Sequence, residues 1–399
     1  MVDEYDVTVV GAGLVGLAAA RALLLRRPGL RLAVLEKESE LAHHQSGRNS
    51  GVVHAGLYYS AESLKARLCR EGRKQLLQFA DEHEIPYRIS GKLVVAVDDT
   101  ELSRLEELRR RGTLNGLRGL RELSGHELRE IEPHVSAVKA LHVPETAVID
   151  FRLVAGALAS EVGRLGGTIL FERRVTKIER RGSRQRVITH SGYELATRSL
   201  ITCAGLQADR VAAMTGTRQR AYRIAPFRGD FFVIAPEARS LVRALIYPVP
   251  DPAFPFLGVH FTRRIDNEVW AGPNAVPALA REGYGRLKIN VRDAKDLATY
   301  PGLWRLGRRY ARTGAAEIWR DIVKRAAVRQ MRRYLPDLET RHVAFGPCGI
   351  RAQVLARDGT LIDDFVLDRE GDVLHVLNAP SPAATASLAI GARLAELVG

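Results

Sequence analysis

The chain has 399 residues, of which 46% are hydrophobic, enough for a large core and more than one simple domain. No apolar run approaches the roughly 20 residues of a membrane-spanning helix, so we expect no membrane span, no signal or transit peptide, and a cytoplasmic location. The cysteines, Cys69, Cys203 and Cys348, are far apart, which argues against a structural zinc site or a disulfide framework.

The first predicted elements are a strand, a tight turn and a helix. The run Tyr5–Val10, rich in β-branched residues, leads into the G-x-G-x-x-G motif Gly11, Gly13 and Gly16, and an Ala- and Leu-rich helical pattern continues to Arg26. In such a unit the first glycine permits the turn, the second lets a pyrophosphate approach the backbone, and the third lets helix and strand pack closely. The free N–H groups at the start of the helix bind phosphate.

A second short strand, residues 31–35, ends at Glu36, which lies 20 residues beyond Gly16. An acidic residue at about this distance accepts hydrogen bonds from the ribose hydroxyls of an adenosine. The opening of the chain therefore predicts a dinucleotide-binding unit and leaves NAD and FAD equally open.

The stretch from His43 to Tyr59 matches neither the helical nor the strand period and is predicted to be a loop. It holds three histidines, an arginine and two tyrosines among several glycines. This density favours a loop that lies against a planar ligand over a plain solvated connection. We expect Asn49 and Ser50 near a phosphate or ribitol group and His54 facing a reaction centre.

The middle of the chain returns to regular patterns, in which small residues again follow a strand. An apolar strand ends in Cys203-Ala204-Gly205, and Val175, on an earlier strand, is a candidate backbone partner for an adenine ring. Cys203 is predicted to be a packing residue because no basic activator adjoins it. The other predicted elements are helices at 61–84, 99–111, 151–166 and 207–214, a helix opened by a capping box at 124–127, and strands at 91–97, 141–150, 168–171, 174–180 and 185–190.

From residue 225 to 275 the pattern becomes that of an antiparallel sheet, which we expect to cover a substrate. His260 lies in its strand 258–262, where taken alone it is typical of a core histidine. The following segment, Arg281–Arg333, carries 15 Lys and Arg against 5 Asp and Glu, with interleaved aromatic residues. Three interpretations stay open for it: a solvated helical face, a surface on an anionic membrane, or a nucleic-acid site.

The end of the chain is again rich in small residues. We predict a Gly-rich turn at 346–353 that leads to Arg351, and strands at 360–364 and 373–377. The loop Asn378–Ser387 then opens a helix at 388–397, and its N–H groups can stabilise a partial negative charge on a ligand.

These motifs together resemble the FAD-dependent D-amino-acid-oxidase family, and more closely its L-2-hydroxyglutarate oxidase/dehydrogenase branch. The resemblance is carried by Ser46–Ser60, by His260–Thr262 with Gly272–Ala275, and by Asn378–Thr385. It implies that the dinucleotide is FAD and that the fold is α/β, with a Rossmann-like FAD-binding domain and an inserted antiparallel-sheet (α+β) substrate domain.

We therefore expect a discontinuous FAD-binding domain at residues 1–84, 145–218 and 340–399. The expected substrate-binding domain takes residues 85–144 and 219–339 and includes a basic helical segment at 281–335.

The resemblance also implies an activity: oxidation of L-2-hydroxyglutarate, or a similar 2-hydroxy acid, to 2-oxoglutarate by hydride transfer to flavin N5. Oxygen and a membrane quinone both stay open as electron acceptors, and contact of 281–335 with the inner membrane would suit the quinone. The alternatives are another enzyme of this family, acting on an amino acid, an amine or glycerol 3-phosphate, and a tRNA-modifying flavoprotein, although nucleic acid is the less favoured partner.

The implied catalytic residues are His54, His260 and Arg351. Either histidine could be the base, Arg351 is the leading clamp for a carboxylate, and Arg228 or Tyr247 would meet a second carboxylate. No metal is expected. The implied FAD-binding residues are Gly11, Gly13, Gly16, Glu36, Lys37, Ser46, Arg48, Asn49, Ser50, Gly51, Val175, Cys203, Ala204, Gly205, Gly349, Ser381, Pro382, Ala383, Ala384 and Thr385.

Overall fold

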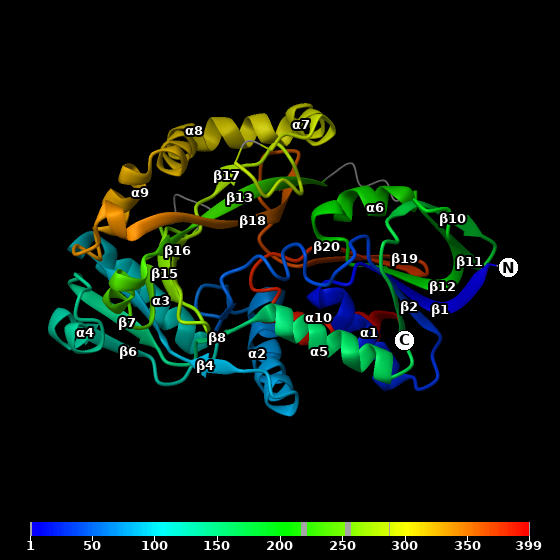
Figure 1. Cartoon of the computed structure of the whole chain (residues 1–399), viewed down its shortest axis with the longest axis horizontal. Coiled ribbons are helices and arrows are strands. Elements are labelled where there is room, and N and C mark those ends of the chain that lie inside the picture. The colour runs from blue at the N-terminus through cyan, green and yellow to red at the C-terminus, as the bar shows by residue number, and fades with distance from the viewer. Residues whose placement is uncertain (1, 217–221, 252–256, 287, 399) are drawn as a thin grey trace.

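Two large β-sheets, one of eight strands and one of nine, organise the protein. The structure is a computed structural model that describes residues 2–216, 222–251, 257–286 and 288–398. Figure 1 shows both ends of the chain, in blue and red, in the half that holds the eight-stranded sheet. The predicted fold class, a Rossmann-like α/β unit joined to a mainly antiparallel sheet, is confirmed.

The eight-stranded sheet has a parallel core, and its order is β10-β11-β12-β1-β2-β9, with β20 paired to β12 and to β19. The pairs β1–β2, β1–β12, β2–β9 and β12–β20 are parallel, and β10, β11 and β19 join in antiparallel fashion. Its strands are β1 (Asp3–Val10), β2 (Leu32–Leu35), β9 (Thr168–Leu170), β10 (Val175–Arg181), β11 (Arg184–Thr189), β12 (Glu194–Thr202), β19 (Val366–Glu370) and β20 (Val373–Asn378).

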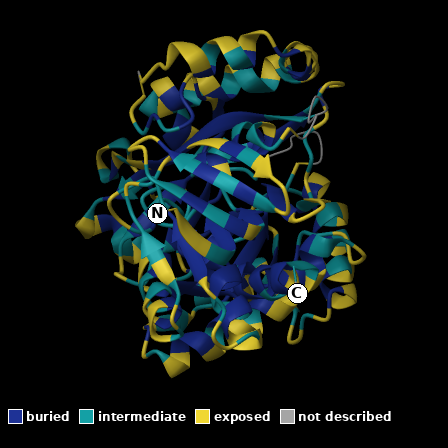
Figure 2. Ribbon diagram, turned by 90° about the vertical axis from the view of Figure 1, so that its right-hand side faces the viewer, coloured by how far each residue is buried: buried dark blue, intermediate teal, exposed yellow. Residues whose placement is uncertain are grey.

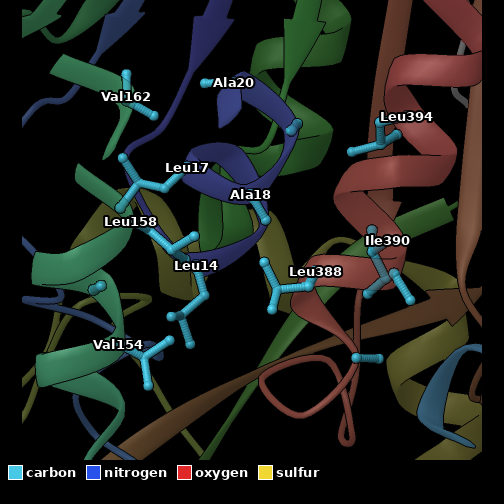
Figure 3. Packing of buried hydrophobic residues seen from close by; sticks show 14 of the residues in the cluster. Leu14, Leu17, Ala18, Ala20, Val154, Leu158, Val162, Leu388, Ile390 and Leu394 are labelled. Atoms are coloured by element: carbon cyan, nitrogen blue, oxygen red, sulfur yellow. The ribbon is translucent and has the colours of Figure 1, made fainter. Parts of the chain in front are cut away.

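Helix α1 (Leu14–Arg26) connects β1 to β2 and packs between α5 (Phe151–Arg164) and α10 (Ser387–Val398). Figure 3 shows apolar side chains of the three helices meeting in one core. The contact with α10 is so close that a Cβ on Gly391 would lie 2.4 Å from the carbonyl carbon of Ala18. Helices α2 (Leu64–Glu82) and α6 (Ala208–Met214) complete this half of the molecule.

The nine-stranded sheet has the order β17-β13-β16-β15-β14-β5-β7-β6, and β18 pairs along the other edge of β13. Its pairs are antiparallel except β5–β14. The strands are β5 (Lys92–Ala96), β6 (Arg121–Ser124), β7 (Lys139–Val143), β13 (Tyr222–Ile234), β14 (Leu245–Pro248), β15 (His260–Arg263), β16 (Val269–Gly272), β17 (Val276–Pro277) and β18 (Val343–Ala356).

Short elements join the two halves. The strands β3 (Val52–Val53), β4 (Tyr87–Ile89) and β8 (Ala147–Ile149) form a small third sheet that anchors the predicted loop 43–59 through β3. Helix α3 (Leu102–Leu114) packs on the nine-stranded sheet, and α4 (Gly125–Ile131) begins with the predicted capping box.

The basic segment forms three helices, α7 (Val291–Ala298), α8 (Pro301–Ile322), which has a kink at Tyr310, and α9 (Lys324–Met331). They lie along the top of Figure 1, and apolar residues of α7 and α8 pack on β13 and β18. Figure 2 shows many exposed residues along these helices. Within the described ranges, no helix is both long enough and apolar enough to span a bilayer.

Two predicted elements near the end of the chain are wrong. Residues 346–353 form no turn but lie inside β18, which pairs with β13 along nearly its whole length. Gly349 serves close packing there, because a Cβ on it would lie 2.4 Å from the backbone oxygen of Arg48. Residues 360–364 contain only a single β-bridge, at Leu361, and the strand begins at Val366 instead.

The predicted division into domains stays a prediction. Its boundary between 218 and 219 lies outside the described residues. The strand β18, which falls in the range 340–399 assigned to FAD binding, pairs within the nine-stranded sheet.

Candidate active site

A cavity of about 760 Å³ lies at the carboxyl ends of β1 and β2, beside the N-terminus of α1. The glycine motif forms its floor. Gly11 has a φ of +106°, and a Cβ on Gly11 would lie 2.4 Å from the Cys203 oxygen, while one on Gly16 would lie 1.9 Å from the Gly11 oxygen. These positions accept only glycine, and the volume is typical of a cofactor site.

Most of the predicted FAD-binding residues line this cavity. The carboxylate of Glu36 accepts hydrogen bonds from the backbone N–H groups of Ala12, at 2.8 Å, and Glu38, at 3.0 Å. Burial raises the pKa of Cys203 to about 12, so its thiol suits packing rather than nucleophilic attack. The lining residues that were predicted are Gly11, Gly13, Gly16, Glu36, Lys37, Ser46, Val175, Cys203, Ala204, Gly205, Ala383 and Ala384.

The chemistry of the lining fits FAD. Gly13, the N-cap of α1, and Leu14, its first residue, line the cavity, so the positive end of the helix faces it. Arg173, Arg174, Lys288 and Arg292 add cationic side chains to the wall, which suits a pyrophosphate. These four residues were not predicted, because they lie far from the glycine motif along the chain.

One wall of the cavity is a segment around Glu282 and Tyr284 that is tied to the opposite wall. The Glu282 carboxylate accepts hydrogen bonds from Lys37 Nζ, at 3.1 Å, and from Gln207 Nε2, at 2.8 Å. The Tyr284 hydroxyl contacts His44 Nδ1, and the Arg48 guanidinium lies 3.8 Å from the centre of the Tyr284 ring. Lys37 and Arg48 therefore hold this wall in position.

The remaining predicted cofactor residues of the 43–59 loop shape the loop itself. Asn49 donates hydrogen bonds to the carbonyls of Gln45, at 3.1 Å, and Ser46, at 2.8 Å, and accepts one from the Gly51 N–H at 2.9 Å. The residues that line the cavity do not include Arg48, Asn49, Ser50 or Gly51, so the contact of these four with FAD stays a prediction.

The loop between β20 and α10 lies between the cavity and His54. Ala383 and Ala384 line the cavity, while Thr385 Oγ1 accepts a hydrogen bond from the His54 N–H at 3.0 Å. Ser381 Oγ lies 3.4 Å from His54 Nε2. Of the other predicted residues, Pro382 accepts a backbone hydrogen bond within this loop from Ala386, and Gly349 packs on Arg48.

His54 and His260 lie in a group of four aromatic side chains and one lysine. We call this group the two-histidine cluster, and its members are His54, Tyr58, Lys92, Tyr247 and His260. The rings of Tyr247 and His260 stack with their centroids 3.9 Å apart. Burial, with a smaller contribution from the charge of Lys92, lowers the pKa of each histidine to about 3. Both imidazoles are therefore neutral near pH 7, the form that can accept a proton.

Lys92 is a member of this cluster that the sequence analysis missed. Its side chain is 1% exposed, and its Nζ lies 4.3 Å from the centre of the Tyr58 ring and 5.1 Å from that of Tyr247. Cation–π contacts contribute up to about 2 kcal/mol, whereas removing an ammonium from water costs several kcal/mol. Burial accordingly lowers the pKa of Lys92 to about 7. The available signal was a lone lysine in the apolar strand Lys92–Ala96.

The two predicted arginines differ in their surroundings. Arg351, on β18, is close enough to His260 to lower the pKa of that imidazole, and burial lowers the pKa of Arg351 itself to about 10. The charge of Glu317 acts on Arg351 in the opposite sense and raises its pKa. Arg228 donates to Asp230 at 3.1 Å and to Asp321 at 2.7 Å. The structure thus brings together His54, Tyr247, His260 and Arg351 but does not join Arg228 to them.

Comparisons with known proteins agree with this geometry. The profile of the DAO family, described as FAD dependent oxidoreductase, matches residues 6–397. The chain is 46% identical to the mitochondrial L-2-hydroxyglutarate dehydrogenase of Nematostella vectensis, over 99% of this chain and 90% of that protein. It is 42% identical to the L-2-hydroxyglutarate dehydrogenase of Indibacter alkaliphilus, over 98% of each chain.

A solved structure with a similar fold is that of L-alpha-glycerophosphate oxidase from Mycoplasma pneumoniae with FAD bound. Its TM-score is 0.80 at 23% identity, with 99% of this chain and 95% of that chain covered. The glycine-lined cavity, the fold and the match along nearly the whole sequence lead to one conclusion: the chain belongs to the FAD-dependent oxidoreductase (DAO) family, and FAD is its cofactor.

Proposed function

We propose that this protein oxidises L-2-hydroxyglutarate, or a closely similar 2-hydroxy acid, to the corresponding 2-oxo acid. The observation that carries the proposal is the pair of buried, neutral histidines, His54 and His260, which feel the charges of Lys92 and Arg351. His54 is bound to the loop that lines the FAD cavity. The names of relatives that are 42% and 46% identical over nearly the whole chain support the choice of substrate.

In the proposed reaction, bound FAD would supply the acceptor for the hydride of the substrate α-carbon. Arg351 holds the carboxylate next to that carbon, because a guanidinium binds a carboxylate with two parallel hydrogen bonds. His54 accepts the proton of the α-hydroxyl at Nε2, the nitrogen near Ser381. His260, whose Nδ1 donates to the Gly258 oxygen at 3.0 Å, has an unprotonated Nε2 and is the alternative acceptor for the same proton.

Substrate charge would also activate the base. The positive charges of Lys92 and Lys65 lower the pKa of His54, and those of Arg351 and Lys92 lower the pKa of His260. A bound dicarboxylate offsets these charges, so the pKa of each imidazole rises when substrate is present. The base therefore becomes stronger in the complex than in the free enzyme.

The test compares His54→Ala, His260→Ala and a control, His126→Ala, whose side chain is 81% exposed. We expect L-2-hydroxyglutarate to reduce the flavin anaerobically at least about 100-fold more slowly in the two cluster variants, the usual scale for loss of a general base. Flavin content should stay at the parent level in all three. Parent rates in both cluster variants would refute the assignment.

A substrate panel separates this function from its rivals in the same family. Glycine, D-amino acids and glycerol 3-phosphate should leave the flavin of the parent protein oxidised, while L-2-hydroxyglutarate bleaches it. If one of the other compounds alone bleaches the flavin, that compound is the substrate and L-2-hydroxyglutarate is not.

We further propose that α7 and α8 contact an anionic membrane at the cytoplasmic side, where a quinone can accept electrons. Trp304 and Trp319, both on α8, are 62% and 61% exposed, and Arg308 and Arg312 are exposed beside them. Such mixed aromatic and basic surfaces suit the lipid interface.

The parent protein should float with phosphatidylglycerol vesicles and the variant with Trp304→Ala and Trp319→Ala should not. A parent that stays unbound, or that binds tRNA with a steep salt dependence instead, would exclude this surface as the membrane contact.

A further inference from the structure

The surroundings of Lys92 point to a second carboxylate site in the two-histidine cluster. We propose that Lys92, with the hydroxyls of Tyr58 and Tyr247, binds the substrate carboxylate that is distant from the reacting carbon. This inference rests on the proposed function, because it states how the same site selects a dicarboxylate.

Lys92 differs from the other deeply buried cations of the described residues. Four lysine and arginine residues there are buried: Lys65, Lys92, Arg228 and Arg281. Three of them have carboxylate partners, since Lys65 binds Asp363, Arg228 binds Asp321 and Arg281 binds Asp209.

Lys92 alone in this group has no ion pair and no hydrogen bond with any described residue. Its polar contacts are the faces of the Tyr58 and Tyr247 rings. Buried charges in proteins are normally paired. An ammonium held in this way is a binding site for an anion that arrives from outside the chain.

The two tyrosines supply hydrogen-bond donors at the same point. The hydroxyl oxygens of Tyr58 and Tyr247 are buried, and that of Tyr58 has no hydrogen-bond partner among the described residues. The Tyr247 hydroxyl lies close enough to the buried Thr262 hydroxyl for the two to interact, and neither hydroxyl contacts a charged group in the described residues. Burial raises the pKa of both tyrosines, so both hydroxyls keep their protons and can donate them to a carboxylate.

Two cations act on the histidines, and a molecule with two carboxylates can use both. Arg351 acts on His260, whereas Lys92 acts on both His260 and His54. A 2-hydroxy dicarboxylate that gives its first carboxylate to Arg351 can give its second to Lys92 while its hydroxyl meets the imidazoles. A monocarboxylate of the same length leaves Lys92 without its partner, and unpaired buried groups discriminate strongly between substrates.

The test uses Lys92→Met, which keeps most of the side-chain volume and removes the charge. The substrates are L-2-hydroxyglutarate and L-2-hydroxypentanoate, which have the same number of carbons but differ in the second carboxylate. For the dicarboxylate we expect kcat/KM to fall about 100-fold, mainly through a higher KM. A loss of this size is typical when a hydrogen bond to a charged group is removed. For the monocarboxylate kcat/KM should change less than about threefold. Lys74→Met, at an exposed position of α2, is the matched control and should resemble the parent.

The inference is overturned if Lys92→Met lowers kcat/KM equally for both substrates, or if the ratio of the two kcat/KM values stays at that of the parent. If Lys92→Met does not fold, Tyr58→Phe provides the second variant. It removes one donor, so KM for the dicarboxylate alone should rise about fivefold to tenfold. No rise in KM for the dicarboxylate would then count against the site.

A binding measurement separates failure of this inference from failure of the proposed function. Glutarate and pentanoate cannot be oxidised at an α-hydroxyl, but their binding can be followed through the flavin absorption spectrum. Glutarate should bind the parent about 100-fold more tightly than Lys92→Met does. If the parent shows this difference but does not oxidise L-2-hydroxyglutarate, the proposed function is wrong and the carboxylate site stands. If the parent oxidises L-2-hydroxyglutarate but Lys92→Met keeps the parent KM and glutarate affinity, the proposed function stands and the carboxylate site at Lys92 is wrong.

Discussion

The ring of Tyr247 lies nearly parallel to the imidazole of His260, with an angle of 22° between the planes and 3.9 Å between the centroids. The two residues stand on the neighbouring antiparallel strands β14 and β15. The stacking and the contact of His260 Nδ1 with the Gly258 oxygen together fix the direction of the other ring nitrogen. Tyr247 therefore acts on the reaction through the orientation of His260 as well as through its hydroxyl.

Replacing the ring and replacing the hydroxyl should have different effects. Tyr247→Ala removes the stacking partner and a buried ring, so we expect about a tenfold loss in the rate of flavin reduction and about 3–5 kcal/mol in the free energy of unfolding. Tyr247→Phe keeps the ring, so its flavin reduction rate should match the parent while KM rises severalfold. Anaerobic stopped-flow and chemical denaturation measure these quantities. A slow Tyr247→Phe with normal KM would show that the hydroxyl, not the ring, supports the chemistry.

The pH dependence of the free enzyme should come from Lys92. Burial lowers its pKa to about 7 and that of the two histidines to about 3. The ammonium form binds the substrate, so kcat/KM for L-2-hydroxyglutarate should be level below about pH 6 and fall about tenfold per unit above about pH 7. Five other titratable groups interact with Lys92. Its ammonium contacts the rings of Tyr58 and Tyr247, its charge lowers the pKa of His54 and His260, and Cys69 raises the pKa of Lys92.

In Lys92→Met this decline should be absent. A profile that instead rises with pH through about 6.5 would mean that a histidine of ordinary pKa controls the reaction.

The glycine turn offers a test of cofactor binding. Gly16→Ala places a Cβ 1.9 Å from the Gly11 oxygen, so strand and helix must separate and the purified protein should contain little or no flavin. Gly163→Ala in α5 is the control, since its Cβ would meet nothing within 4 Å. That variant should keep its flavin and gain up to about 1 kcal/mol in stability, as an alanine favours a helix. The ratio of flavin to protein decides the test, and a fully loaded Gly16→Ala would refute the predicted role of the motif.

Arg228 should matter for folding rather than for substrate binding. Arg228→Met leaves the carboxylates of Asp230 and Asp321 buried beside each other, which costs about 3–5 kcal/mol of unfolding free energy. Burial and Asp321 already raise the pKa of Asp230 to about 7. Because a protonated Asp230 relieves the repulsion, the loss of stability should be smaller at pH 5 than at pH 8.

The exposed Arg308→Met serves as the control for this change. If the folded Arg228→Met enzyme has a KM about tenfold higher instead, at parent stability, then Arg228 contacts the substrate as the sequence predicted.

The sequence predicts best where structure is local. The β1–α1–β2 unit could be read from Gly11, Gly13, Gly16 and Glu36 because its turn, its helix start and the acidic residue predicted to bind ribose lie within one short stretch. The resemblance of the 43–59 and 378–387 loops to a known family predicted FAD, which is confirmed, and the site residues His54 and Ser381, whose roles stay predictions. Thr385, predicted as a cofactor contact, holds the backbone of His54.

Long-range features escaped prediction. Lys92 joins the two-histidine cluster only because β5 pairs with β14, an element more than 150 residues later in the chain. Glycines in 346–353 suggested a turn, yet Gly349 is there to let β18 lie close to Arg48. The sequence pattern alone does not distinguish a glycine that allows a turn from a glycine that allows a neighbouring backbone to pack closely.

The close contact between Gly391 and Ala18 has a consequence for the order in which the protein can fold. During synthesis the glycine turn and α1 emerge long before α10, so the apolar face of α1 that packs on α10 stays uncovered until the residues of α10 have been made. The core of the half that holds the cofactor therefore closes only after the strands of the nine-stranded sheet have been synthesised. Variants that weaken α10 should therefore lengthen the interval in which the nascent chain is open to aggregation, even where the finished enzyme tolerates them.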